Sequence, residues 1–400
     1  MRADHLPQRH CMVVHAYYPL GETRVEREAL ALVEHGVEVD VLCLRDEGET
    51  DFETINGVNI YRFPVKRGST PSLFSRLREY LTFFFHVFFK FFSLQPNRRY
   101  RVIQAHNLPD FLVFSALIPR LMGARLILDI HDRMPEFFAA QSNRSMDSFL
   151  VRCVLFEEKL SCFFADHVIT VTELWRKKLI SQHGLSPEKV SVVMNVADDR
   201  VFYPDPALAH PQHQDGYFHL IYHGTFKKHY GLDILIRGVG LAREQIPHIQ
   251  ATLQGCGEFY DEMARLVDEL GLRDNVNIQN FILPTEKLPA LIARADAGVI
   301  SNRNDIFTGD LLPTKMMEYV ALKTPVIAAR TRVIAEYFDD DAVRFFTPED
   351  PASLAEGILD LYYHPDKMKR QLLAANNFIN AHNWGIISKK YVDLVKSLAA

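Results

Sequence analysis

The sequence has few of the features that mark secreted, metal-dependent or hydrolytic proteins. Its five cysteines are odd in number and form no Cys-x-x-Cys pair, so we expect reduced thiols and a cytoplasmic location. Residues 1–10 are polar and lead directly into a strand-like run, without the features of a signal peptide. No cysteine cluster and no nucleophile elbow is present. We therefore expect no bound metal and no serine-hydrolase chemistry.

An excess of basic charge is also missing. The chain has 45 Lys and Arg residues against 50 Asp and Glu residues, a formal net charge of −5, which does not favour nucleic acid as a partner. Apolar residues make up 48% of the 400 positions, enough for buried cores and more than one ordinary core holds. We therefore expect two globular domains.

Strand-like and helix-like stretches alternate through both halves of the chain. A pattern of strand then helix predicts parallel sheets with right-handed crossovers. Residues 199–216 are rich in Pro, Asp and His and interrupt the pattern as a linker. We expect two Rossmann-like, doubly wound α/β domains that face each other across a cleft: residues 1–205 with a returning helix at 382–400, and residues 206–381. Ligands of such sheets bind beyond the carboxyl ends of the strands. The expected strands are Cys11–Ala16, Val37–Leu44, Arg101–Ala105, Arg125–Ile130, His167–Val171, Val190–Met194, Phe218–Tyr222, Gln250–Leu253, Val276–Asn280, Ala297–Ser301 and Val326–Ala329.

Residues 81–94, LTFFFHVFFKFFSL, form an aromatic run that is too short to span a bilayer, which takes about 20 apolar residues. The flanking sequence is strongly basic, with Glu79 as the single acid between Arg62 and Arg101. An apolar face with a basic rim favours contact of residues 72–101 with an anionic membrane surface. The alternative is a core helix that covers the first sheet.

Residues 310–326, DLLPTKMMEYVALKTPV, place two carboxylates eight positions apart. Pro313 can open a helix, whose N-terminus presents free N–H groups to an anion. Lys315 lies in the first turn, where the helix dipole disfavours a cation, and an anion bound there would explain it. Asp310 and Glu318 could then accept hydrogen bonds from sugar and ribose hydroxyls. The alternative is a set of solvated surface charges.

This stretch resembles the Glu-x7-Glu region of the family-4 retaining glycosyltransferases, which have the GT-B fold. The resemblance covers nearly the whole chain and is carried by six segments in family order. They are residues 18–28, residues 106–110, residues 128–136 (LDIHDRMPE), residues 193–195 followed by Phe202-x-Pro204, residues 222–225 (YHGT) and residues 310–326. Bacterial members of this kind build exopolysaccharides, lipid-linked oligosaccharides or glycolipids.

The resemblance implies roles for particular residues. His131 would hydrogen-bond the donor sugar near the reacting carbon, and Asp310 would orient sugar hydroxyls. On the acceptor side it points to Gly21, Arg24 and Asp132, with turn formation as the alternative for Asp132 and a capping charge for Arg24. The usual diphosphate cations are replaced here by Thr225 and Tyr230, so Lys228, Arg303 and Lys315 are candidates for the charge. The donor-side candidates together are Gly224, Thr225, Lys228, Gly255, Ile282, Arg303, Leu312, Thr314, Lys315 and Glu318.

The sequence therefore predicts a hexosyltransferase that uses a nucleoside diphosphate sugar and no metal or other cofactor. The acceptor would be a hydroxyl of a glycan, a lipid-linked oligosaccharide or a glycolipid. We expect a peripheral protein on the inner face of a bacterial cell membrane. Two alternatives remain: a sugar-nucleotide epimerase of similar fold, and a non-catalytic GT-B protein that serves as a membrane-bound partner.

Overall fold

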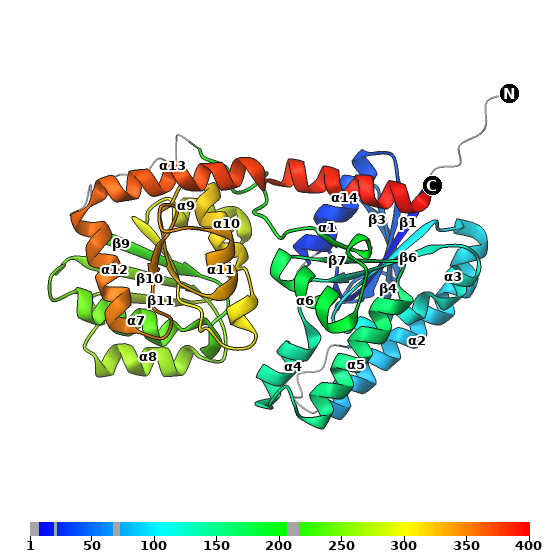
Figure 1. Cartoon of the computed structure of the whole chain (residues 1–400), viewed down its shortest axis with the longest axis horizontal. Helices are drawn as coiled ribbons and strands as arrows, with labels where there is room; N and C mark the ends of the chain where they lie inside the picture. The colour runs from blue at the N-terminus through cyan, green and yellow to red at the C-terminus, as the bar shows by residue number, and fades with distance from the viewer. Residues whose placement is uncertain (1–7, 20–21, 67–72, 206–215) are drawn as a thin grey trace. The chain divides into compact units, whose positions relative to one another are not determined.

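A computed structural model describes residues 8–19, 22–66, 73–205 and 216–400. The chain forms two compact units (Figure 1). Unit 1 comprises Met1–Asn195 and Ile387–Ala400, and unit 2 comprises Val196–Ile386. From the sequence we expected these divisions after residues 205 and 381. Each unit is built on a mainly parallel sheet, so the prediction of two α/β units is confirmed.

The sheet of unit 1 has eight strands in the order β3-β4-β2-β1-β5-β6-β7-β8. All neighbours pair in parallel except β3, which is antiparallel to β4. Its carboxyl edge therefore collects the loops that follow β1, β2, β4, β5, β6 and β7. The strands are β1 (Arg9–Tyr17), β2 (Glu38–Leu44), β3 (Phe52–Ile55), β4 (Val58–Phe63), β5 (Val102–His106), β6 (Arg125–Ile130), β7 (His167–Thr170) and β8 (Val190–Val192).

Helices cover both faces of this sheet. On one face, Glu28 of α1 and Tyr391 of α14 both bond to the side chain of Gln104 in β5. On the other face, Phe83 and Phe91 of α2 pack in one core cluster with alternate strand residues such as Cys11. The helices are α1 (Thr23–Glu34), α2 (Leu73–Arg98), η1 (Asp110–Ala116), α3 (Leu117–Leu121), α4 (Met134–Ser142), α5 (Phe149–Phe164), α6 (Glu173–His183), η2 (Pro187–Lys189) and α14 (Trp384–Ala399).

Several elements differ from the sequence-based expectation. The hairpin β3–β4 was not predicted, although Asn56 and Gly57, with φ of 52° and 82°, make the tight turn that Asn-Gly pairs favour. The aromatic run belongs to a longer helix, α2, of 26 residues. The connection between β5 and β6 is divided into a 3₁₀ segment, η1, and the short α3.

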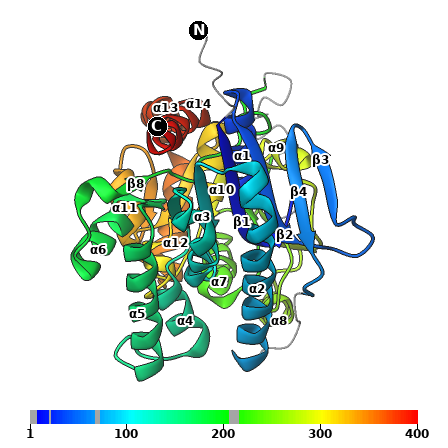
Figure 2. The same ribbon diagram turned by 90° about the vertical axis from the view of Figure 1, so that its right-hand side faces the viewer.

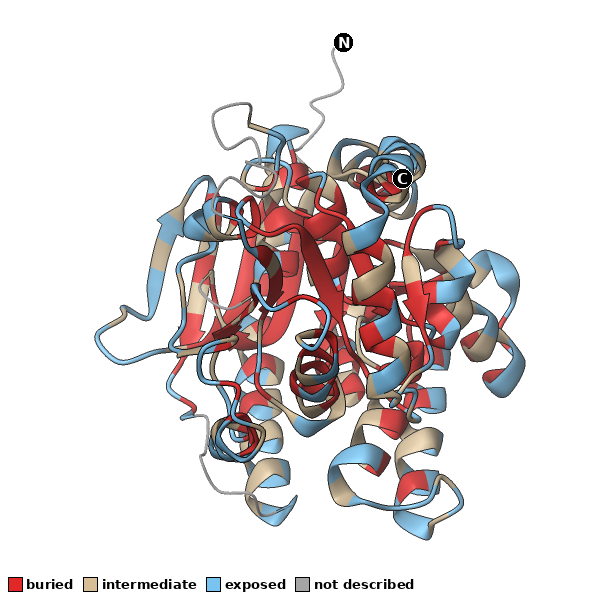
Figure 3. Cartoon of the chain, turned by 90° about the vertical axis from the view of Figure 1, so that its left-hand side faces the viewer, coloured by how far each residue is buried: buried red, intermediate tan, exposed pale blue. Residues whose placement is uncertain are grey.

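Unit 2 has a six-stranded parallel sheet in the order β11-β10-β9-β12-β13-β14. Its strands are buried, and its helices expose their outer faces (Figure 3). The strands are β9 (Phe218–His223), β10 (Ile249–Gly255), β11 (Val276–Asn280), β12 (Ala297–Ile300), β13 (Val326–Ala329) and β14 (Arg344–Phe346). The helices are η4 (Lys228–Tyr230), α7 (Leu232–Ala242), α8 (Tyr260–Glu269), η5 (Thr285–Lys287), α9 (Leu288–Ile292), η6 (Thr308–Asp310), α10 (Thr314–Ala321), α11 (Arg332–Tyr337), α12 (Pro351–Tyr363) and α13 (Pro365–Ala381).

Among the helices in the described part of the chain, none combines the length and the apolar character needed to cross a bilayer.

Candidate functional site

Helix α10 directs its first turn toward the carboxyl end of β9. Pro313 is its N-cap residue and Thr314, which is exposed, begins the helix. Because the first helical residues, Thr314 and Lys315, have backbone N–H groups without helical partners, this end can receive an anion. Leu312, immediately before, is buried and anchors the loop.

The ammonium of Lys315 is held between two aromatic rings. Its Nζ lies 4.1 Å from the ring centroid of Tyr222 and 4.6 Å from that of Tyr230, and it donates a 2.9 Å hydrogen bond to the Tyr222 hydroxyl. Burial lowers the pKa of Lys315 to about 7, although the nearby Glu318 carboxylate acts in the opposite direction. This ammonium is half-buried, and its nearest neighbours, two rings and a hydroxyl, do not balance its positive charge. An anionic ligand would balance that charge.

One turn further along α10, Glu318 faces the end of β9. Its carboxylate lies 3.0 Å from Nε2 of His223, the last residue of that strand. The His223 backbone N–H donates to the Tyr319 hydroxyl at 3.3 Å, which ties the same helix to the same strand end. Lys315 and Glu318 are therefore presented together at the carboxyl end of β9. The sequence analysis gave no role to His223, although a histidine that ends a strand before a glycine could have been considered.

One of the three cation candidates, Arg303, is engaged with other side chains of the protein. Its Nη2 donates to both carboxylate oxygens of Asp233, at 2.7 and 2.8 Å, and its Nη1 donates to Glu349 at 3.1 Å. Its Nε donates to the Lys228 backbone carbonyl at 3.1 Å. These contacts join the η4 turn to α7, and the supply of charge by Arg303 to the donor stays a prediction. The Lys228 side chain is exposed and stays a candidate.

The glycines in the loops after β9 and β10 allow the backbones of these two loops to pack closely against each other. A Cβ on Gly255 would lie 1.8 Å from the Gly224 carbonyl oxygen, and one on Gly257 would lie 2.3 Å from that of Phe226. The space that the missing Cβ of Gly255 leaves is thus filled by a second backbone, and its contact with the donor stays a prediction. Gly224 itself contacts Lys315, whose Nζ would lie 3.1 Å from a Cβ added there. Thr225, which follows, is exposed.

The remaining donor-side candidates lie at neighbouring loops. Asp310 is buried at the end of η6, and its Oδ1 accepts a 2.7 Å hydrogen bond from Arg332 of α11. Its predicted contact with sugar hydroxyls stays a prediction, because the carboxylate is engaged with Arg332 here. Ile282 follows β11 and is 80% exposed, and its predicted contact with a nucleobase likewise stays a prediction.

In unit 1, His131 directly follows β6. Its backbone N–H donates to the Asn107 side chain at 3.1 Å, and no hydrogen-bond partner for its Nδ1 is found among the described residues. Burial lowers the pKa of His131 to about 3. Asp129 opposes this shift, whereas Arg24 and His106 reinforce it. The imidazole is therefore neutral near pH 7 and suits hydrogen bonding better than proton abstraction.

A buried ion pair lies beneath His131. Arg24 donates to both carboxylate oxygens of Asp129, at 2.9 and 3.0 Å, and Nδ1 of His106 lies 3.1 Å from the same carboxylate. Arg24 also bonds to the Val193 carbonyl at 2.9 Å and to the Asn195 side chain at 2.7 Å. Burial alone would raise the pKa of Asp129, but Arg24 and His106 hold it well below its usual range.

These contacts occupy the guanidinium of Arg24 inside unit 1, and its acceptor-side role stays a prediction. Asp132 accepts a 2.5 Å hydrogen bond from Asn107 through its backbone carbonyl, which is consistent with a turn. Gly21, the third acceptor-side candidate, lies outside the described residues. Asp129 itself was missed, although a carboxylate within the apolar strand sequence LILDI is a recognisable signal.

His106, Asp129 and His131 each bring one possible metal-ligand atom within 4.8 Å of the other two. Two imidazoles and a carboxylate are a chemically reasonable set for a transition metal. However, both oxygens of Asp129 already accept hydrogen bonds from Arg24. A metal ion would have to compete with that guanidinium for Asp129. The three side chains therefore fit the ion pair with Arg24 better than they fit a bound metal ion.

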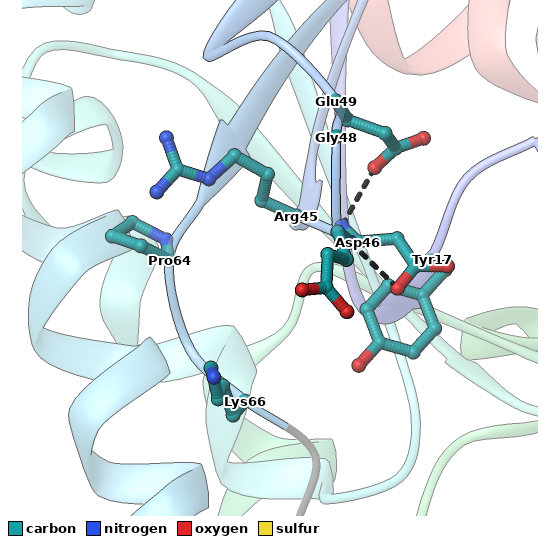
Figure 4. A pocket seen from close by; sticks show the side chains of 8 residues that line it. Tyr17, Arg45, Asp46, Gly48, Glu49, Pro64 and Lys66 are labelled. Carbon is teal, nitrogen blue, oxygen red and sulfur yellow. Dashed lines mark hydrogen bonds between the residues drawn. The ribbon is translucent and has the colours of Figure 1, made fainter.

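A polar pocket of about 540 Å³ opens at the carboxyl edge of the sheet of unit 1 (Figure 4). It lies where β1 ends at Tyr17, beyond β2 and β4, and the sequence analysis did not anticipate it. Besides Tyr17, the lining carries three carboxylates and two cations. A hydroxyl-rich ligand suits such a mixed lining better than a phosphate does, because the acids outnumber the bases. The lining residues are Tyr17, Arg45, Asp46, Glu47, Gly48, Glu49, Pro64 and Lys66.

Two family models match the chain and together cover most of it. The glycosyl transferase 4-like domain matches residues 21–195, and the glycosyl transferases group 1 domain matches residues 208–377. The chain is a family-4-like glycosyltransferase. The resemblance carried by the six sequence segments is thereby confirmed at the level of the family.

Curated relatives agree with this assignment at low identity. The chitobiosyldiphosphodolichol beta-mannosyltransferase of Debaryomyces hansenii is 22% identical over 377 residues, 86% of this chain and 79% of that protein. The putative colanic acid biosynthesis glycosyltransferase WcaL of Escherichia coli is 23% identical over 189 residues, 47% of this chain. The match with WcaL spans 45% of the length of that relative.

Solved structures show that this family-4-like glycosyltransferase has the GT-B fold. Sucrose-phosphate synthase from Thermosynechococcus elongatus has a TM-score of 0.77 and 19% identity, over 98% of this chain and 99% of that chain. WaaG, a glycosyltransferase involved in lipopolysaccharide biosynthesis, has a TM-score of 0.69 and 15% identity, over 96% and 99%. Anabaena HepE in complex with UDP and glucose has a TM-score of 0.72 and 17% identity, over 98% and 100%.

Proposed function

We propose that this glycosyltransferase transfers a hexose, with retention of anomeric configuration, from a nucleoside diphosphate sugar to an acceptor hydroxyl. The observation that carries the proposal is the Lys315 ammonium at the start of α10, flanked by Tyr222 and Tyr230 with no carboxylate in hydrogen-bonding contact with it among the interactions of the described residues. A diphosphate at this helix end would meet both the free N–H groups and the cation. The same turn carries Glu318, which is suited to ribose hydroxyls.

Charge stabilisation is the main catalytic contribution in this proposal. The bond to the sugar breaks as negative charge grows on the departing diphosphate, and preorganised donors at that position lower the barrier. Lys315 and the N-terminus of α10 supply such donors, with Lys228 as a further exposed cation. No step requires a metal, so we expect activity to persist after treatment with EDTA.

His131 would act on the donor sugar as a neutral hydrogen-bonding group. Its buried Nδ1 and its low pKa both argue against a role as general base. Retention without an obvious protein nucleophile is then consistent with attack on the face from which the diphosphate leaves. Asp310 would assist by orienting sugar hydroxyls after rearrangement of its contact with Arg332.

We further propose a glycan or lipid-linked acceptor for the polar pocket of unit 1. Its carboxylates and cations can exchange hydrogen bonds with sugar hydroxyls, and the Tyr17 ring offers an apolar face. The relatives named for dolichol-linked and colanic acid substrates support this class of acceptor. Such acceptors would be met at the inner face of the cell membrane, through contact of residues 72–101 with an anionic surface.

The first test is a thermal-shift screen with the nucleoside diphosphates. A ligand present at 100 times its dissociation constant adds about 2.7 kcal/mol to the free energy of unfolding, which is readily detected. The matching nucleotide sugars are then incubated with the protein and followed by NMR. Slow release of sugar with its anomeric configuration retained supports the proposal.

Other outcomes of the same experiment identify other functions. Inversion at the anomeric carbon would contradict the retaining mechanism. Interconversion of donor sugars without their release would indicate an epimerase. Absence of both binding and turnover for every nucleotide sugar would indicate a non-catalytic partner protein.

A further inference from the structure

Three helices on one face of the unit 1 sheet expose large apolar side chains. On α2, Phe74 is 77% exposed and Phe89 is 63% exposed, and on α5, Phe149 is 79% exposed and Phe156 is 61% exposed. Phe149, Phe156 and Phe163 are spaced by seven residues and therefore share one side of α5. The C-terminal end of α3 adds Leu121, at 75%. Only the part on α2 was visible as an unusual stretch of sequence.

These exposed faces belong to a single packed layer. The Phe111 ring of η1 lies 6.1 Å from Phe84 of α2, and the Phe114 ring of the same segment lies 4.8 Å from Phe164 of α5. At the N-terminal end of α2, Arg76 donates to Gln141 of α4, which packs against α5. Figure 2 shows α2 and α5 running in a similar direction, with α3 and α4 between them. Their outer side chains thus form one surface with two lines of phenylalanine.

The charges of this surface have one sign. Along α2 and α5, both described in full, the exposed charged residues are Arg78, Arg152 and Lys159, all basic. The acidic residues of the two helices turn inward: Glu79 pairs with His15 at 3.2 Å, Glu157 accepts from Ser161 at 2.7 Å and Glu158 pairs with Arg133 at 2.7 Å. A second copy of the same basic face would be repelled, whereas an anionic lipid surface is complementary.

We propose that α2, α3 and α5 form one lipid-docking surface, on which unit 1 rests against the headgroups of an anionic leaflet. This proposal extends the membrane contact suggested above for residues 72–101 to α3 and α5, and it does not depend on the transfer reaction. Contact through α2 alone would leave the phenylalanines of α5 in water, whereas contact along two helices also fixes how unit 1 is rotated on the leaflet.

The rotation of unit 1 on the leaflet matters because α2 and α5 both begin at the same edge of the sheet. A helix that follows a strand of a parallel sheet returns antiparallel to it, so the N-terminal ends of α2 and α5 lie at the carboxyl edge. Phe74 and Phe149, the most exposed phenylalanines, occupy these ends, at the edge where His131 follows β6. The docked face therefore brings a lipid-borne acceptor to the edge of the sheet that carries the candidate site of unit 1.

The test measures binding of the full chain to vesicles of equal parts phosphatidylglycerol and phosphatidylcholine, and to vesicles of phosphatidylcholine alone. The α5 variant is Phe149→Ser with Phe156→Ser, and the α2 variant is Phe85→Ser with Phe89→Ser. The matched control is Tyr363→Ser with Leu373→Ser, two exposed apolar side chains of unit 2. The charge variant is Arg152→Gln with Lys159→Gln, and its control is Arg265→Gln with Lys287→Gln, which are exposed in unit 2.

We expect the wild type and both controls to bind the anionic vesicles, and the α2, α5 and charge variants each to bind about tenfold more weakly. Wild-type binding to the anionic vesicles with no loss in the α5 and charge variants would restrict the surface to α2 and overturn the proposal. Equal binding of the wild type to both kinds of vesicle would overturn it as well. So would a wild-type dimer that the α5 variant converts to a monomer, because the face would then join two copies.

A shift of the melting temperature by nucleoside diphosphate, measured on each variant without vesicles, reports on the donor site of unit 2. Loss of vesicle binding with this shift intact supports the lipid-docking surface. If nucleoside diphosphate does not shift the melting temperature of the wild type, the donor site is contradicted and the vesicle result is not affected.

Discussion

Lys315 donates a 2.9 Å hydrogen bond to the hydroxyl of Tyr222, and its ammonium also lies over that tyrosine's ring. The pair joins the first turn of α10 to the end of β9, the two elements that frame the candidate donor site. Two tyrosines can hold the cation in place without neutralising it. The position where the family resemblance expected a lysine is occupied by Tyr230, whose ring completes the enclosure. In the proposed function, the cation for the diphosphate is therefore supplied from the helix instead of from the loop.

Replacement of this cation tests its role directly. We expect Lys315→Met to weaken nucleoside diphosphate binding by about tenfold to a hundredfold, the range for loss of a charge-assisted hydrogen bond. Isothermal titration calorimetry would measure the change, with Lys287→Met, an exposed lysine of η5, as the control. An unaltered dissociation constant in Lys315→Met would show that the diphosphate binds elsewhere.

Donor affinity should also depend on pH. The pKa of Lys315 is lowered to about 7, so above pH 7 the ammonium is largely deprotonated in the free protein. A bound diphosphate favours the charged form and raises that pKa, so binding above pH 7 takes up a proton. Affinity should therefore fall with rising pH, by up to about tenfold per unit between pH 7.5 and 9, where the diphosphate stays fully ionised. Lys315→Met should show a flat profile over this range, and a parallel fall in the variant would assign the effect to another group.

Glu318 and Lys315 should differ in which part of the nucleotide they recognise. Glu318→Gln keeps the shape of the side chain and removes its charge, so we expect about tenfold weaker binding of the nucleoside diphosphate. Inorganic pyrophosphate should be affected less, because it loses only the support that Glu318 gives to the charge of Lys315. Lys315→Met should weaken both ligands. Competition calorimetry separates the two effects, and Glu286→Gln is a matched exposed control. Equal weakening of pyrophosphate and nucleoside diphosphate binding by Glu318→Gln would contradict the assignment of Glu318 to the ribose.

The alternation of strands and helices was predictable because buried parallel strands and amphipathic helices have strong, separate sequence periods. The region around Lys315 was predictable because a lysine in the first turn of a helix contradicts the helix dipole. The hairpin β3–β4 carried a clear signal in Asn56-Gly57 that went unused. The second half of the lipid-docking surface was not accessible from the sequence: Phe149, Phe156 and Phe163 stand among other apolar residues in FLVRCVLFEEKLSCFF, and only the fold shows which of these side chains face outward.

The contacts of Arg24 and Arg303 could not be predicted either, because both depend on partners distant in the chain. We expect Arg24→Met to lower the free energy of unfolding by about 3–5 kcal/mol, since it leaves the buried Asp129 carboxylate without its cation. Urea denaturation followed by tryptophan fluorescence would measure this, because Trp175 is buried in unit 1. A variant of wild-type stability that instead shows a raised KM for acceptor would support the acceptor-side interpretation of Arg24.

The polar pocket of unit 1 leads to a prediction about the acceptor that can be tested separately from the donor site of unit 2. Glu47 and Lys66 are both exposed at its rim, so Glu47→Gln with Lys66→Gln should leave the fold intact while it removes two charged hydrogen-bonding groups. We expect the KM for a glycan acceptor to rise by about tenfold or more, with nucleotide binding unchanged because Lys315 and Glu318 belong to unit 2. Glu286→Gln with Lys287→Gln removes the same pair of charges from η5 and serves as the control. If both double variants raise the KM equally, the effect is one of general surface charge and the pocket does not bind the acceptor; a rise confined to the first variant assigns the acceptor to the carboxyl edge beyond β1, β2 and β4.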